Sequence, residues 1–213
     1  MQIFNLTHQI GEDSLLFDGD NTFQQSICTS NYGTHTCRVS AYHMTCSSHA
    51  GTHADMPSHF IDVPLKSYQQ SQYTWPAYMI DLSHIKWVVS KQDFLQTMQF
   101  CNIEKKICIF KLYQWWTKME YATLSSDLIW YLWSLQCPMI GVNTISVDQY
   151  DTKDIWNANH GLLYHHNIAI VENLNLSDIT HASLEWYCYT TFDESKKAID
   201  ARSIASILYI ISP

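Results

Sequence analysis

Basic residues are scarce in this sequence and absent from its first part. The 213 residues include 12 Lys and Arg against 20 Asp and Glu, which gives a formal net charge of -8. The basic residues are mostly dispersed, so they form no patch suited to a nucleic-acid backbone or an anionic membrane surface. No Lys or Arg precedes Arg38, so the N-terminus lacks the charged region of a secretory signal peptide. Nucleic acids and membranes are therefore not expected partners.

Long apolar runs and paired cysteine motifs are also missing. No apolar run approaches the roughly 20 residues that a membrane-spanning helix needs. Seven cysteines are scattered along the chain without a CxxC pair, at positions 28, 37, 46, 101, 108, 137 and 188. An odd, scattered set of this kind is typical of reduced thiols. We therefore expect a cytoplasmic protein in which Cys46, although it lies near a possible metal motif, is not a ligand.

The composition that remains is that of a globular protein. Hydrophobic residues make up 46% of the chain, and 213 residues suffice for a sizeable core. No internal repeat, low-complexity tract or linker divides the sequence. We expect one domain spanning residues 1–213.

Residues 48–60 concentrate side chains that bind metals. The stretch reads SHAGTHADMPSHF and holds four possible ligands within eleven residues: His49, His53, Asp55 and His59. Neutral imidazole and carboxylate are the usual ligands of Zn and Mn. Glycine and proline disfavour one continuous helix, whereas a tight turn followed by an extended segment lets these side chains converge. The alternative is a solvated polar loop, because a chain with 11 histidines shows some clustering by chance.

The stretch resembles the H-x-G-T-H-x-D-x-P-x-H-F signature of the cyclase-like metal-dependent hydrolases, which include bacterial kynurenine formamidases and isatin hydrolases. Residues 5–10 resemble the family's opening D-L-[ST]-x-x-[IL] pattern, and residues 141–148 resemble G-[IV]-D-T-x-S-V-D. His160 lies where the family carries H-x-x-L-L, and Glu172 lies in its I-x-E-x-L pattern. The resemblance covers almost the whole length.

The resemblance implies a site for one or two divalent ions, Zn or Mn. It implies five metal ligands: His49, His53, Asp55, His160 and Glu172. Asp55 would bridge a first ion to a second, and His59 matches the family's catalytic proton donor and acceptor. Glu172 is also a candidate from its position directly after the apolar run 168–171, with a solvated turn as the alternative.

Three of the positions that depart from the family pattern bear on the choice of substrate. Phe17 stands where formamidases carry a Trp that lines the substrate pocket, so Phe17 is the candidate substrate-binding residue. The alternative for Phe17 is a core side chain in a surface turn. Tyr113 lies in place of a threonine-glycine-tryptophan turn, and Asn143 replaces the usual Asp. These changes leave the substrate open.

The resemblance implies hydrolysis of an amide carbon–nitrogen bond by metal-activated water, with a histidine moving the proton. Its best single substrate is an aryl formamide, N-formylkynurenine, which would yield kynurenine and formate in tryptophan catabolism. Two alternatives remain: a related hydrolase of a cyclic amide or lactone, and a metal-binding protein without turnover. A small-molecule substrate and a homodimer or homotetramer are the partners that the family implies.

The fold implied is α/β, a mixed β-sheet with the swivelling β/α/β architecture of the cyclase-like proteins. Alternating strand and helix patterns are compatible with this class. Strand patterns occur at 3–6, 34–45, 78–82, 87–89, 106–111, 139–142, 168–171, 185–192 and 204–211. Helix patterns begin after Ser90, at 124–127 and at Thr152, and Pro138 ends the second. Trp130 and Trp133 are expected to widen the apolar face of that second helix.

Overall fold

A mixed eight-stranded sheet forms the centre of the protein. The computed structural model describes residues 3–8, 10–11, 14, 16–32, 37–55, 75–99, 101–115, 120–179, 185–189 and 209–211. The strand order is β1 (Ile3–Asn5), β14 (Tyr209–Ile211), β13 (Glu185–Tyr189), β5 (Trp75–Leu82), β7 (Ile107–Leu112), β11 (Met139–Val142), β12 (Ala169–Glu172) and β4 (His53–Asp55). The expected α/β class with a mixed sheet is confirmed. The remainder of the strand patterns at 185–192 and 204–211 lies outside the described residues.

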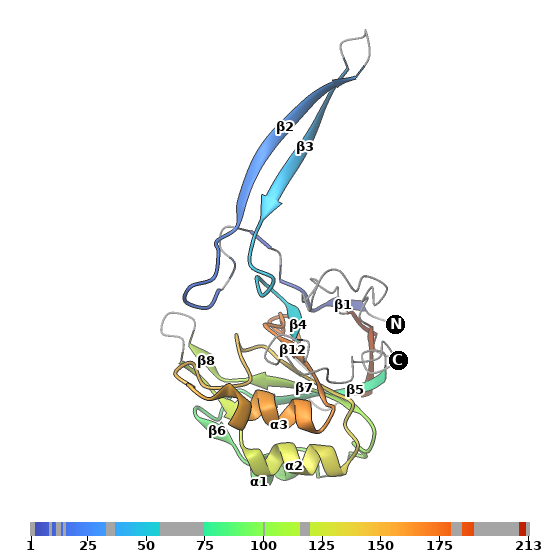
Figure 1. Ribbon diagram of the computed structural model, residues 1–213. Coiled ribbons are helices and arrows are strands. Elements are labelled where there is room, and N and C mark those ends of the chain that lie inside the picture. Colours follow the sequence, from blue (N-terminus) through green and yellow to red (C-terminus); the bar gives the residue numbers. More distant parts are fainter. Residues whose placement is uncertain are drawn as a thin grey trace.

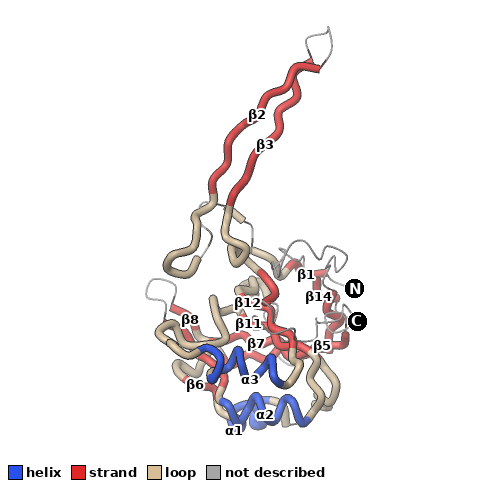
Figure 2. The backbone as a smooth tube through the Cα atoms, viewed as in Figure 1, coloured by secondary structure: helices blue, strands red, loops and turns tan. Residues whose placement is uncertain are grey.

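Four neighbouring strands, β5, β7, β11 and β12, run parallel, and antiparallel strands flank them on both sides. Their order in the sheet follows their order in the chain, so successive crossovers all advance in one direction. Right-handed crossovers then place their helices on the same face. The helices α1 (Lys91–Thr97), α2 (Ser126–Ser134) and α3 (Asn159–His165) lie together on one face, as Figures 1 and 2 show.

Ser90 caps the N-terminus of α1, as the sequence predicts. The Ser90 hydroxyl accepts a hydrogen bond from the Asp93 backbone N–H at 3.2 Å. In return the Asp93 carboxylate accepts one from the Ser90 backbone N–H at 2.9 Å. This reciprocal capping satisfies two backbone donors that the first turn leaves without helical partners.

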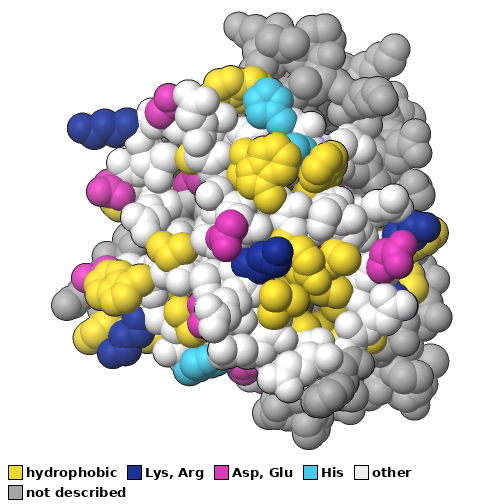
Figure 3. Space-filling view, turned by 90° about the horizontal axis from the view of Figure 1, so that it is seen from below, with side chains coloured by type: hydrophobic (Ala, Val, Ile, Leu, Met, Phe, Trp, Pro, Cys, Tyr) yellow, Lys and Arg dark blue, Asp and Glu magenta, His cyan; other side chains and the backbone are white. Residues whose placement is uncertain are grey.

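The buried stripe of α2 is narrower than expected. Leu128, Ile129 and Leu132 are fully buried, whereas Trp130 and Trp133 are each 47% exposed. The expectation for the two tryptophans is therefore wrong. At about 100° per residue they point more than a quarter-turn away from the leucine stripe. Figure 3 views the molecule from this helical side, where hydrophobic side chains lie interspersed with charged and polar ones.

The helix expected from Thr152 begins later than predicted. A 3₁₀ turn, Ile155–Asn157, comes first, and the Asp154 carboxylate caps it by accepting from the Asn157 backbone N–H at 3.2 Å. α3 then starts at Asn159, whose backbone N–H donates to the Asp148 carboxylate at 2.7 Å. The start of α3 thus depends on a tertiary contact that local sequence patterns do not reveal.

A long antiparallel hairpin, β2 (Gln24–Tyr32) and β3 (Cys37–Thr45), projects from the body (Figure 1). The strand expected at 34–45 is confirmed over Cys37–Thr45. The sequence did not predict β2, because QQSICTSNY shows no clear alternation of apolar and polar residues. Two small sheets complete the described elements: β6 (Val88–Val89) pairs with β10 (Thr123–Leu124), and β8 (Gln114–Trp115) pairs with β9 (Glu120–Tyr121).

The core lies between the sheet and the helices. Phe94 of α1 and Phe110 of β7 are fully buried, with ring centroids 6.0 Å apart. Strands β7, β11 and β12 are apolar except for Lys111 and Glu172, and all their residues but Lys111 are buried, as expected of parallel strands inside a sheet. None of the helices in the described part of the chain is long and apolar enough to span a bilayer.

Candidate metal centre

The pairing of β4 with β12 brings His53, Asp55 and Glu172 to one face of the sheet edge. Gly51 has a φ of +70°, which glycine adopts without strain, and turns the chain into the extended segment β4. His53 lies directly opposite Glu172 in the antiparallel register, and Asp55, two residues on, shares the face of His53. His53 Nε2 is 3.5 Å from the Glu172 carboxylate and 3.4 Å from that of Asp55.

His49 and His160 complete the cluster from two other segments. His49 Nε2 lies 3.4 Å from Asp55 Oδ1, just before the Gly51 turn. His160 Nε2, from the first turn of α3, lies 3.2 Å from Asp55 Oδ2 and 3.3 Å from Glu172 Oε1. The structure therefore brings together all five side chains that the sequence singled out as ligands. They form two triads that share Asp55, and the ligand atoms of each triad lie within 4.8 Å of one another: His49, His53, Asp55 and Asp55, His160, Glu172.

The chemistry and spacing of the cluster fit a divalent cation. His53, Asp55, His160 and Glu172 are each at most 4% exposed. His53 Nε2 and Asp55 Oδ1 are buried and make no hydrogen bond with any described part of the chain. Burial of carboxylates in this way is costly unless a cation compensates them. Two ligand atoms about 2.1 Å from one tetrahedral ion are about 3.4 Å apart, which matches the observed nitrogen–oxygen separations.

The carboxylates control the titration of the buried histidines. Burial alone lowers the pKa of His53, but the carboxylates of Asp55 and Glu172 outweigh it and raise this pKa to about 10. Burial likewise opposes protonation of His160, yet hydrogen bonding to Asp148, Asp55 and Glu172 raises its pKa well above the usual value. A divalent cation competes with protons for these same nitrogen atoms, so the field that raises the pKa values also favours the cation.

Hydrogen bonds at the other ring nitrogens orient two of the imidazoles. His53 Nδ1 lies 2.9 Å from the Gly51 carbonyl oxygen, and His160 Nδ1 lies 2.6 Å from Asp148 Oδ2. Each contact directs Nε2 into the cluster, as partners beyond the ligands do in metal sites. The Glu172 carboxylate is held by the Val147 backbone N–H at 2.7 Å. Sequence reasoning missed Asp148, although it is the last residue of the G-V-N-T-I-S-V-D segment.

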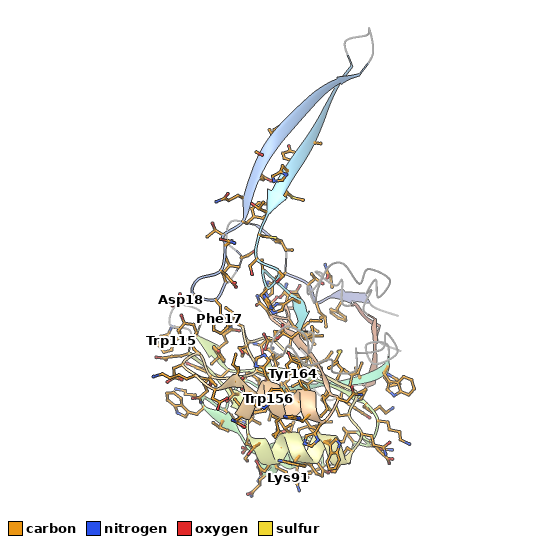
Figure 4. The ribbon with its side chains drawn as sticks, viewed as in Figure 1. Phe17, Asp18, Lys91, Trp115, Trp156 and Tyr164 are labelled. Atoms are coloured by element: carbon orange, nitrogen blue, oxygen red, sulfur yellow. The ribbon has the colours of Figure 1, made fainter. Side chains whose placement is uncertain are left out.

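A cavity of about 240 Å³ opens onto the cluster. Phe17 lines it, stacked on Tyr150 with ring centroids 5.3 Å apart, and the Tyr150 hydroxyl donates to the Asp18 carboxylate. Phe17 and Asp18 lie on the loop at the base of the hairpin (Figure 4). The remaining walls come from Asp20, Ile145, Ser146, Gln149, Thr152 and Ile155. His59, the expected proton donor and acceptor, lies outside the described residues.

Comparison with known proteins agrees with this geometry. Residues 4–149 match the family model described as "Putative cyclase". The chain belongs to the cyclase family. It is 26% identical over 190 residues to a kynurenine formamidase from Bacillus mycoides, covering 86% of this chain and 87% of that protein. It is 22% identical over 198 residues to a kynurenine formamidase from Bordetella pertussis, covering 86% and 88%.

Solved structures in the same comparison share the fold of this cyclase-family chain. Isatin hydrolase A from Labrenzia aggregata superposes with a TM-score of 0.76 at 17% identity, covering 100% of this chain and 94% of the other. A structure described as a potential metal-dependent hydrolase with cyclase activity gives a TM-score of 0.75 at 16% identity, covering 100% and 98%. The expected cyclase-like architecture is confirmed.

Proposed function

We propose that this cyclase-family protein hydrolyses an aryl formamide, with N-formylkynurenine as the first candidate substrate. The chain is a metal-dependent hydrolase of carbon–nitrogen bonds, in keeping with its kynurenine formamidase relatives. The observation that carries the proposal is the pair of triads sharing Asp55 on the floor of a cavity with an aromatic wall. Zn and Mn both suit three imidazoles and two carboxylates.

The residues of the chain have distinct parts in the proposed reaction. His49, His53 and Asp55 would hold one ion, and Asp55, His160 and Glu172 a second. When bound, a divalent ion would lower the pKa of a water to about 7 and act as a Lewis acid on the substrate carbonyl. Phe17 and Tyr150 would together form one aromatic wall beside the arene and position the formamide over the cluster. His59 would deliver the proton to the leaving nitrogen, because imidazole titrates near neutral pH.

Metal-stripped protein refilled separately with Zn and Mn tests the assignment. We expect metal-restored release of kynurenine and formate from N-formylkynurenine. His59→Ala should abolish turnover while the protein keeps its metal, which separates an enzyme from a protein that only binds metal. Turnover of isatin without turnover of N-formylkynurenine would instead favour a cyclic-amide hydrolase, the activity named for one structural neighbour.

We also propose a homo-oligomer that uses the hairpin. In the β2–β3 register Ile27 lies opposite Tyr42 and Gln25 opposite Met44, so these four side chains share one face. Ile27, Tyr42 and Met44 are each more than half exposed. An isolated two-stranded hairpin is marginally stable in water, and a second copy covering this face would stabilise it. Ile27→Ser with Tyr42→Ser should lower the mass measured by light scattering, whereas Ser26→Ala on the opposite face should not.

A cytoplasmic location is part of the same proposal. Among the cysteines whose side chains the structure describes, four are free thiols: Cys46, Cys101, Cys108 and Cys137. Cys108 and Cys137 are buried in the core, where hydrogen bonding to the Cys137 thiol, together with burial, raises the pKa of Cys108 and keeps it unreactive. Free thiols support a reducing compartment.

A further inference from the structure

The wall of the cavity carries one carboxylate that the metal cluster does not use. Asp20 lines the cavity beside Phe17 and is partly buried. Its side chain makes no hydrogen bond or ion pair with the part of the chain that the structure describes. A carboxylate held in a cavity wall without a cationic partner is available to a ligand that brings one.

The described lining of the cavity holds no positive side chain to balance this carboxylate. Among the described residues that line the cavity none is Lys or Arg, whereas four are carboxylates: Asp20, Asp55, Asp148 and Glu172. One divalent ion with neutral imidazoles leaves two negative charges, and two ions make the lining neutral but never positive. A substrate carboxylate entering beside Asp20 would lose its water and gain no ion-pair partner from the described lining residues.

The groups around Asp20 suit a cation. The Asp20 backbone N–H donates to the Phe17 carbonyl at 3.1 Å, and Gly19 between them has a φ of +95°. This turn holds the Phe17 ring and the Asp20 carboxylate on one short segment. The Phe17 ring is in turn stacked on Tyr150. Aromatic faces next to a carboxylate are the groups that proteins use to bind ammonium ions.

We propose that the site selects aryl formamides whose side chain ends in an ammonium group and carries no carboxylate, with Asp20 as the partner of the ammonium. The inference rests on the proposed function and specifies its substrate class. N-Formylkynurenine carries both an ammonium and a carboxylate, so it gains the contact with Asp20 but also suffers the repulsion. Its decarboxylated counterpart, N-formylkynuramine, keeps only the favourable group.

Three formamides that share the same ring and carbonyl test the proposal with the metal-loaded protein. They are N-formylkynuramine, N-formylkynurenine and the neutral compound in which a plain ethyl ketone replaces the charged side chain. We expect kcat/KM for N-formylkynuramine to exceed that of N-formylkynurenine by about tenfold or more, as for other charge-assisted contacts. Asp20→Asn should remove most of the advantage of the amine over the neutral compound, measured within each protein as the ratio of their kcat/KM values.

Asp151→Asn is the matched control. Asp151 is exposed and lies between two residues of the cavity wall, Tyr150 and Thr152, without lining the cavity itself. It tests whether any nearby carboxylate favours amines through its long-range field. The same advantage of the amine in Asp151→Asn as in the wild type supports a direct contact with Asp20. An equal loss in both variants overturns that contact.

The remaining outcomes separate the inference from the function on which it rests. Equal kcat/KM values for the three compounds, or a preference for N-formylkynurenine, would overturn the selectivity while the formamidase assignment stands. If none of the three is hydrolysed, the assignment itself fails. Calorimetric binding of the products still tests the site in that case: kynuramine should bind more tightly than kynurenine, and Asp20→Asn should abolish the difference. Equal binding would overturn the inference.

Discussion

Asp148→Asn is expected to weaken metal binding through His160. One carboxylate oxygen of Asp148 accepts from the Asn159 backbone N–H at 2.7 Å, and the other lies 2.6 Å from His160 Nδ1. An amide has one acceptor oxygen and one donor nitrogen, so it cannot satisfy both groups. If its oxygen stays with Asn159, its NH₂ group faces Nδ1. The imidazole proton then moves to Nε2, the atom that must be unprotonated to bind a metal.

The magnitude follows from this lost orientation. Removing a carboxylate that positions a metal-bound histidine typically costs 10- to 100-fold in metal affinity, which corresponds to about 1.4–2.7 kcal/mol. The reverse orientation of the amide is also unfavourable. It would place NH₂ against the Asn159 N–H in a buried site and leave a donor unsatisfied, at about 1–3 kcal/mol of folding stability.

Competition with a chromophoric zinc chelator at pH 7.5 measures the change, with thermal unfolding recorded in parallel. Asp178→Asn is the control, because Asp178 is an exposed carboxylate outside the centre. In a His160→Ala background, Asp148→Asn should add less than about twofold, since the proposed effect passes through that ring. A zinc affinity within twofold of wild type, or an undiminished loss when His160 is absent, would refute the reasoning.

Three further predictions concern the centre and its support. Zinc affinity should rise from pH 6 to pH 8, by up to about tenfold per pH unit for each proton displaced. The reason is that the pKa of His53 is raised to about 10, so zinc binding must release the proton of this histidine. Chelator competition at three pH values measures the change. Gly161→Ala should destabilise the fold by about 3 kcal/mol or more in urea unfolding, since its Cβ would lie 1.7 Å from the Trp156 carbonyl oxygen. Gly141→Ala should cost less, because the one close contact of its Cβ, at 2.7 Å, is with the end of the Leu174 side chain. Ser90→Ala should cost about 1 kcal/mol in the same assay through loss of the α1 cap, with metal affinity unchanged.

Local signals in the sequence predicted those parts of the fold that depend on local physics. The cap at Ser90 and the apolar strands beside it need only nearby residues, and both lie close to where the sequence placed them. The predicted start of α3 was wrong because Asp148, in a loop before the helix, accepts a hydrogen bond from the first backbone N–H of α3. The hairpin strand β2 was missed because a strand that projects from the body has no core to impose an apolar pattern.

The residues of the candidate centre also differ in how far the sequence alone predicted them. His49, His53 and Asp55 were visible because one turn and one short strand suffice to bring them together. His160 required the family resemblance. Glu172 was a candidate from its place after an apolar run, but only the β4–β12 pairing and the position of α3 bring the two residues to the same point. The contributions of Asp148 and Asp20 depend on what faces their carboxylates, which no spacing along the chain encodes.

The structure also shows which of these three departures from the family pattern, Phe17, Tyr113 and Asn143, lie at the cavity. Asn143 accepts from the Leu112 backbone N–H at 2.6 Å and donates to the Leu112 carbonyl at 3.1 Å, so it clamps the end of β11 to β7. An aspartate could not donate the second bond, which gives the amide a structural reason. Tyr113 packs against the core, and neither it nor Asn143 is among the described residues that line the cavity. Of the three, Phe17 alone lies in the described wall of the cavity, next to Asp20. Among these departures, therefore, the one in the turn at the base of the hairpin is the one expected to alter the choice of substrate.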